Sequence, residues 1–173
     1  MRSGFAAVAA LAVSMPCFAQ PAADSKTDTN PFFMEWATPF GMAPFEKIRA
    51  EHFLPAFEAG LAERRKEVEA IASNPAAPTF ANTVEALEVG GTALSKVSNV
   101  FYTLVGAETN DELQAITKKV APSLSALRDD MMLDEKLFAR VKAVWEKRET
   151  SSLTPEQKRL VEETFKDFVR GGA

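Results

Sequence analysis

The chain has 173 residues, of which 46% are hydrophobic and 25% are charged, and its formal net charge at pH 7 is -4. This length suffices for one domain with a hydrophobic core. Because a nucleic-acid-binding domain ordinarily carries a surplus of basic residues, the acidic balance argues against nucleic acid as the main partner.

Residues 1–19 have the pattern of a cleavable secretory signal peptide. Arg2 precedes a short apolar run over residues 5–13, and Cys17-Phe18-Ala19 offers a cleavage site before Gln20. The apolar run is too short to cross the roughly 30 Å of hydrocarbon in a bilayer, so we expect no stable membrane anchor. We expect a periplasmic or secreted protein whose mature form lacks Cys17, the only cysteine, and therefore depends on packing alone.

Two segments without long helices are expected next. Residues 20–31 are small and polar and predict a flexible leader. Residues 32–49 predict an extended arm, because Pro39 and Pro44 forbid a long helix. The arm carries six large apolar side chains: Phe32, Phe33, Trp36, Phe40, Met42 and Phe45. Because wet aromatic surface is costly, we expect the arm to pack on a larger body; the alternative is an exposed site for a partner.

Helical periodicity begins near Glu51. A first helix is predicted over about 51–72, and its apolar face comprises Phe53, Phe57, Leu61, Val68 and Ile71. A second helix of about seven turns is predicted to start at Thr79, a good N-cap, and to reach Val105. Gly90-Gly91 lies inside this helix, where glycine is unfavourable, and a close crossing with another helix or a kink would explain it.

Three more helices are predicted. Residues 109–112 read as a capping box before a helix that Pro122 should kink or split. The next helix runs from about Leu133 to Arg148, and the last begins at residues 154–157 with a Thr cap and Pro at the first position. The fold class is therefore all-α, with about five amphipathic helices in a lobe over residues 50–173 and short connections that favour antiparallel neighbours.

No catalytic, cofactor-binding or metal-binding residue is assigned. A zinc peptidase helix needs two histidines at i and i+4, and this chain has only His52. His52 is a candidate general base, but a polar residue beside Glu51 in a first helical turn is the favoured interpretation because no partner constellation is visible.

Other polar and glycine motifs are interpreted structurally. The adjacent acids Asp129-Asp130 and Glu162-Glu163 point in different directions on a helix and should be solvated. The basic run Arg64-Arg65-Lys66 is interspersed with glutamates and is predicted to be a solvated face. Met131-Met132 favours the core over a ligand groove, and Gly90-Gly91 lacks the context of a phosphate loop.

Several phrases in order carry a family resemblance. They are Asn30-Pro31-Phe32, residues 44–48 (PFEKI), 51–58 (EHFLPAFE), 74–87 (NPAAPTFANTVEAL), 109–113 (TNDEL) and 165–173 (FKDFVRGGA). Together they resemble the N-terminal part of the thimet-type zinc oligopeptidases, closest to the bacterial peptidyl-dipeptidases, with the oligopeptidase A group as near relatives. The resemblance covers residues 30–173.

The resemblance implies an almost wholly helical, two-lobed peptidase with a deep channel, and a zinc site in a C-terminal half that this sequence lacks. None of the family's zinc ligands maps onto a position here, so this chain alone is expected to be inactive and to bind no zinc. Residues 30–173 would be the helical lobe that walls the channel and admits oligopeptides, truncated before its partner, the catalytic domain. The alternative is a free-standing periplasmic helical module that binds peptides without catalysis.

Overall fold

The computed structural model describes residues 30–107 and 110–172. The predicted signal peptide and residues 20–29 of the predicted leader lie outside this part of the chain. Within it, the structure contains helices of three kinds and no strand. The α-helices are α1 (Phe53–Ala72), α2 (Ala86–Val89), α3 (Thr92–Ala107), α4 (Asp111–Met132), α5 (Glu135–Glu146) and α6 (Pro155–Gly171). The shorter elements are η1 (Pro31–Phe33), η2 (Pro39–Gly41), η3 (Ala50–His52) and the π-helical turn η4 (Phe80–Glu85). The predicted all-α class, with five long helices in the described residues, is confirmed.

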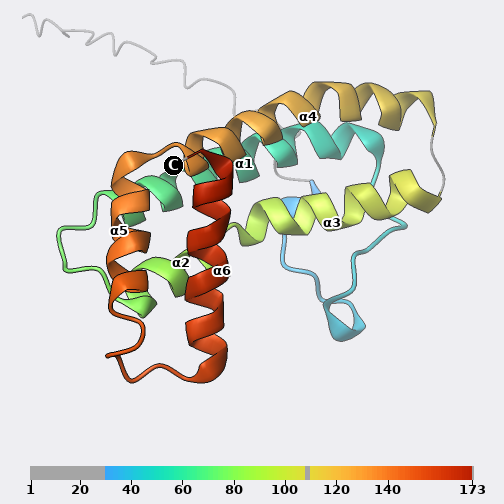
Figure 1. Cartoon of the computed structure of the whole chain (residues 1–173). Helices are drawn as coiled ribbons and strands as arrows, with labels where there is room; N and C mark the ends of the chain where they lie inside the picture. The colour runs from blue at the N-terminus through green and yellow to red at the C-terminus, as the bar shows by residue number, and fades with distance from the viewer. Residues whose placement is uncertain (1–29, 108–109, 173) are drawn as a thin grey trace, which may run out of the picture.

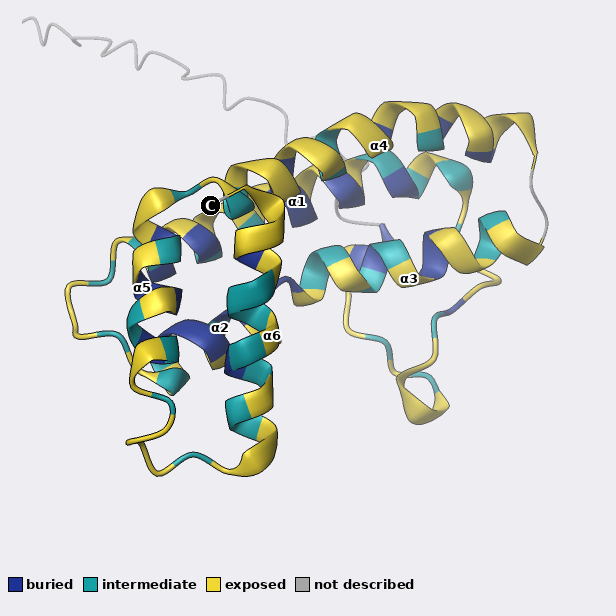
Figure 2. Ribbon diagram, viewed as in Figure 1, coloured by how far each residue is buried: buried dark blue, intermediate teal, exposed yellow. Residues whose placement is uncertain are grey.

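Two packed units share the long helices α1 and α4 (Figure 1). In the first, α3 and the N-terminal parts of α1 and α4 enclose a core that includes Phe53, Phe57, Phe101 and Ile116, with Phe32 from the arm. In the second, α2, α5 and α6 pack on the C-terminal part of α1. Figure 2 shows the buried residues of each unit facing inward between its helices. Edge-to-face aromatic contacts link Phe101 to Phe53 and to Phe57 at 5.0 and 5.3 Å, a favourable geometry for aromatic rings.

Capping side chains fix where the helices begin. Thr79 accepts a hydrogen bond from the Asn82 N–H at 3.2 Å, while the Asn82 side chain accepts one from the Thr79 N–H at 2.9 Å. Thr154 and Gln157 make the same reciprocal pair at the start of α6. Such pairs satisfy donors that have no partner within the helix. At α4 the cap is Asn110; Thr109, the first residue of the predicted capping box, lies outside the described residues.

The predicted seven-turn helix is wrong in one respect, because it is broken at Gly90-Gly91. Gly90 is extended (ψ 173°) and Gly91 has φ +73°, so the chain leaves α2 and restarts as α3. Of the two explanations offered by the sequence, the kink is the one observed there. A close helix crossing does exist, but at Gly60 of α1, where an added Cβ would lie 2.9 Å from the Leu94 Cα of α3.

Pro122 does not split its helix. The α4 helix runs without interruption from Asp111 to Met132 with Pro122 inside it. Proline lacks the N–H that would bond to the carbonyl four residues earlier. The packing of Leu113, Ile116, Val120 and Leu127, all buried, keeps both halves of α4 in place.

The arm differs from its prediction in two ways: its first residues are more buried than expected, and most of its aromatic side chains are less buried. Asn30 and Pro31, which were assigned to the flexible leader, are buried, and Asn30 caps η1. Of the six large apolar side chains, Phe32 is buried and Trp36 partly buried, whereas Phe40 is fully exposed (101%) and Phe33, Met42 and Phe45 are also exposed. The prolines and Gly41 turn the arm away from α3 (Figure 1), so most of its aromatic surface reaches no core.

No helix in the described part of the chain is long and apolar enough to cross a membrane.

Candidate functional site

His52 lies where η3 meets α1 and makes structural contacts. Its Nδ1 accepts a hydrogen bond from the Arg49 N–H at 3.0 Å, and its carbonyl accepts one from the Asn30 side-chain amide at 2.9 Å. Its Nε2 is 4.0 Å from Glu51 Oε1. The imidazole therefore caps a turn and its backbone anchors the arm, as expected for a polar residue at a helix start rather than a general base.

The two acidic pairs lie on helix surfaces. Both Glu162 and Glu163 contact Lys166, at 2.7 and 3.4 Å, and all three side chains are roughly half exposed. The hydrogen bond from Lys166 holds the pKa of Glu162 below its ordinary value. Asp130 is exposed and lies 3.9 Å from Arg65. Exposed pairs of this kind contribute little to stability, and the arrangement confirms solvated faces.

A zinc ion takes three or four nitrogen, sulfur or carboxylate ligands from the protein. Among residues 30–107 and 110–172, no three His, Cys, Asp or Glu side chains come together in a way that could hold a metal. His52 is the one histidine of the chain, and its Nδ1 is already an acceptor for a backbone N–H. The described residues therefore do not fit a zinc site.

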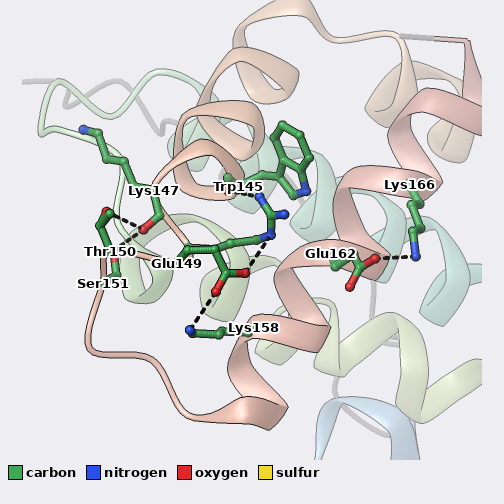
Figure 3. Close-up of polar contacts among 9 residues, drawn as sticks. Trp145, Lys147, Glu149, Thr150, Ser151, Lys158, Glu162 and Lys166 are labelled. Carbon is green, nitrogen blue, oxygen red and sulfur yellow. Dashed lines mark hydrogen bonds and ion pairs between the residues drawn. The ribbon is translucent and has the colours of Figure 1, made fainter.

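The connection between α5 and α6 carries a small polar network (Figure 3). The Lys147 carbonyl accepts hydrogen bonds from the hydroxyls of Thr150 and Ser151, at 3.1 and 2.8 Å. Glu149 lies 2.9 Å from Lys158, whose hydrogen bond lowers the pKa of that carboxyl.

Beside this network, the Arg148 guanidinium lies 4.4 Å from the Trp145 ring, which stacks on Phe165 with 4.3 Å between centroids. The stack joins the end of α5 to the middle of α6. A separate hollow lies between the end of α5, the start of α6 and the loop before η4, lined by Pro78, Phe80, Val144, Lys147, Leu153 and Gln157 among others.

The arm is attached to α3 through Lys96. The Lys96 ammonium donates hydrogen bonds to the carbonyls of Phe32 and Met34, at 3.2 and 2.8 Å, and lies 4.2 Å from the Trp36 ring centroid. This cation–π contact adds to the two hydrogen bonds, and partial burial lowers the pKa of Lys96. The attached arm presents five large apolar side chains to solvent: Phe33, Met34, Phe40, Met42 and Phe45. Such a group is typical of an interaction surface.

Arg140 was not singled out by the sequence analysis, yet it is a buried charged residue (7% exposed) in α5. Its Nη1 donates to the carbonyls of Asn74 and Ala76 at 2.7 and 3.0 Å. Its Nη2 donates to Asn82 Oδ1 and Thr83 Oγ1 at 3.0 and 3.3 Å. The guanidinium thus holds the loop between α1 and η4, whose carbonyls have no helix to bond them. Its Nε is buried and finds no hydrogen-bond partner among the described residues.

Arg64 corrects the prediction that residues 64–66 form a solvated face. Its side chain is only 11% exposed and its Nη2 donates to the Leu87 carbonyl at 2.8 Å. Its Nη1 lies 3.1 Å from Glu67 Oε2, and that same oxygen accepts the Gly91 N–H at 2.7 Å. Arg65 remains exposed, as expected. The break in the predicted helix and the inward-facing, partly buried Arg64 are therefore one structural feature.

Comparison with known proteins gives consistent matches. The sequence model of the family described as "Neurolysin/Thimet oligopeptidase, N-terminal domain" matches residues 55–173. "Dipeptidyl carboxypeptidase" of Salmonella typhimurium is 43% identical over 145 residues, 84% of this chain and 21% of that protein. The Escherichia coli protein of the same name is 42% identical over 147 residues, 85% of this chain and 22% of that protein. "Oligopeptidase A" of Escherichia coli is 26% identical over 144 residues, 83% of this chain and 21% of that protein. The chain spans about a fifth of the length of the curated relatives that it matches.

Proposed function

The chain belongs to the neurolysin/thimet oligopeptidase family, whose N-terminal domain it contains, and from this we propose that it walls the peptide channel of a secreted zinc peptidase. The longer protein would resemble dipeptidyl carboxypeptidase and hydrolyse short oligopeptides, releasing dipeptides from their C-termini. The observation that carries the proposal is the match of the N-terminal domain over residues 55–173, together with 43% identity to a protein of that name.

In this proposal the chain binds and excludes rather than cleaves. Its two helical units form one wall, because α1 and α4 pass through both of them. Such a wall would admit an extended peptide and keep folded proteins out. Zinc belongs to the proposal only as the cofactor of the longer protein, since the described residues of this chain do not fit it.

The first experiment is to read the coding sequence beyond residue 173. We expect an encoded His-Glu-x-x-His helix, because this motif places two zinc ligands and a carboxylate on one face. The longer product should release dipeptides from short fluorogenic peptides, and a chelator should abolish that activity. The pure 173-residue chain should show no chelator-sensitive turnover; if it does, catalysis belongs to this chain and the proposal is wrong.

The alternative, a free-standing module that binds peptides, predicts a different set of results. An unrelated downstream sequence, a cooperative thermal melt of the 173-residue chain and measurable peptide affinity without turnover would favour it. A product that is molten and binds the dye ANS would exclude it, because exposed apolar surface without fixed packing cannot form a specific site.

Export rests on residues 1–19 and is tested separately. N-terminal sequencing of the protein from a periplasmic fraction should start at Gln20. A protein that retains Arg2 and stays in the cytoplasm would contradict export and leave the peptidase assignment untouched.

A further inference from the structure

We propose that Arg64 and Glu67 form a latch that fixes the orientation of the two packed units at the Gly90-Gly91 break. The inference rests on the proposed function only for its consequence, which is the width of the peptide channel. The latch itself is argued from contacts within this chain.

The break at Gly90-Gly91 leaves backbone groups that need hydrogen-bond partners. Where a helix is interrupted, the carbonyls at the end of one piece and the N–H groups at the start of the next lose their partners. Arginine can only donate hydrogen bonds and a carboxylate can only accept them. Arg64 donates to the Leu87 carbonyl at the end of α2, and Glu67 accepts the Gly91 N–H at the start of α3. The break needs both kinds of partner, and the pair supplies one of each.

The position of Arg64 and Glu67 on α1 lets them reach both ends of the break. Arg64 and Glu67 are three residues apart on α1 and lie on the same face of that helix, where they also pair with each other at 3.1 Å. Both helix ends are therefore tied to the same turn of the helix that runs through both units. The charges match the ends that they contact, since a carboxylate favours a helix N-terminus and a cation favours a C-terminus.

Both positions of the break favour glycine. A Cβ at Gly90 would collide with Arg64 Nη1, and a Cβ at Gly91 would lie 3.2 Å from Arg64 Cδ. Gly91 also has φ +73°, a conformation that residues with a Cβ rarely adopt. Gly91 thus permits the turn, and the absence of a side chain at Gly90 leaves room for the Arg64 guanidinium in its observed position.

Arg64 and Glu67 lie at the boundary between the two packed units. Phe53, Ala56 and Phe57 of α1 belong to the core that contains α3, whereas Val68 and Ile71 belong to the core that contains α5 and α6. Arg64 and Glu67 lie between these two groups. In α4, Val120 belongs to the first core and Leu124 packs against it, whereas Met131 packs on the second core, so the boundary in α4 lies after Leu124. The α1 and α4 helices continue through both units, whereas α2 and α3 meet only at the two glycines, and Arg64 and Glu67 tie this third connection to α1.

The test measures the distance between the units in the whole chain. Spin labels are attached at Asn99→Cys on α3 and Lys142→Cys on α5, both exposed, with Cys17→Ser to remove the native thiol. We expect one narrow distance distribution in this background. Arg64→Gln and Glu67→Gln should broaden or shift it by several ångströms, and the matched controls Arg65→Gln and Glu63→Gln, exposed on the same helix, should not.

A second measurement covers variants that fail to fold. In the unaltered chain the Gly91 amide should exchange with solvent slowly, because Glu67 accepts its proton. Fast exchange of that amide, or a narrow and unshifted distribution in folded Arg64→Gln and Glu67→Gln, would overturn the latch. Neither readout uses peptidase activity, so failure of the latch is distinguishable from failure of the proposed function.

Discussion

Arg140, which is buried, and Arg64, which is partly buried, both bond to interrupted backbone, but they do so with different sets of partners. Arg140 reaches a loop that presents only acceptors, two carbonyls and the side-chain oxygens of Asn82 and Thr83, and it binds them without any carboxylate among the described residues. Arg64 reaches a helix break that presents an acceptor and a donor, and it is paired with Glu67. The hydrogen-bonding needs of the interrupted backbone therefore decide whether an arginine acts alone or with an acid.

The two guanidinium groups differ in how the cost of losing their hydration is offset. A buried cation without an acid loses its hydration and regains only neutral hydrogen bonds, which is costly unless these bonds are many and well formed. Arg140 makes four of them. Arg64 makes fewer contacts but has an opposite charge at 3.1 Å. We therefore expect the Arg140 site to depend on geometry and the Arg64 site to depend on charge.

The largest effect is expected for Arg140→Met. The variant leaves the partly buried Asn74 and Ala76 carbonyl bonds and the polar side chains of η4 without their donor, while it removes a buried charge. We expect the lost hydrogen bonds to outweigh the benefit of removing the buried charge, so that the free energy of unfolding falls by about 3 kcal/mol. Urea unfolding followed by circular dichroism measures this, with Lys142→Met, exposed on the same helix, as the control. An unchanged urea midpoint would mean that removing the buried charge gains as much free energy as the loss of its four hydrogen bonds costs.

Gly91→Ala tests the other site through its backbone. Alanine at φ +73° is strained, and its Cβ would lie 3.2 Å from Arg64 Cδ, a tight contact, so we expect a loss of about 2 kcal/mol. The matched control is Gly106→Ala near the end of α3, where nothing lies within 4 Å of the new Cβ. That substitution should be neutral or stabilise by up to about 1 kcal/mol. Equal effects of the two substitutions would show that the positive φ at Gly91 is not required.

Contacts between residues close together in the chain can be predicted from the sequence. The caps formed by Thr79 with Asn82 and by Thr154 with Gln157 join residues three positions apart, so the pattern is visible in the sequence itself. The role of His52 at a helix start follows from the same local reasoning. These features together with the apolar periodicity predict the helices and most of their bounds.

The two arginine sites are invisible to that reasoning for a physical reason. Arg64 bonds to a carbonyl 23 positions away and Arg140 to one 66 positions away, so neither contact exists until the helices pack. Residues 64–66 look like a solvated run because nearby glutamates alternate with the basic side chains, and only packing shows which of the three faces inward. For the arm the prediction is wrong in the opposite sense, because it overestimates burial. Phe40 and its neighbours are exposed, and no surface among the described residues covers them.

The charge dependence of the Arg64 site is tested with a double-mutant cycle. Arg64→Gln and Glu67→Gln, made singly and together, should give a coupling free energy of about 1 kcal/mol, within the range for residues in one network. The cycle isolates the pair from the bonds that each partner makes to the backbone. Arg140 with Lys142 serves as the uncoupled reference. A coupling near zero would mean that Arg64 and Glu67 act only through their separate backbone contacts, which would make the two arginine sites alike.

The smallest effect is expected at Glu149, because its ion pair with Lys158 is exposed, unlike the contacts of the two arginines. The hydrogen bond from Lys158 depresses the pKa of Glu149, so its contribution to stability is present above the unfolded pKa of about 4.3 and is lost as the pH falls through the lower folded value. We expect Glu149→Gln to lower Tm slightly at pH 7, and the difference to vanish near pH 3 or in 1 M salt, because exposed pairs are screened. Glu146→Gln, exposed on α5, is the control and should show no such pH dependence. The same salt should leave the Arg140→Met difference unchanged, because that guanidinium is buried and its bonds go to neutral oxygens; a salt effect of equal size at both sites would remove the distinction between geometry and charge.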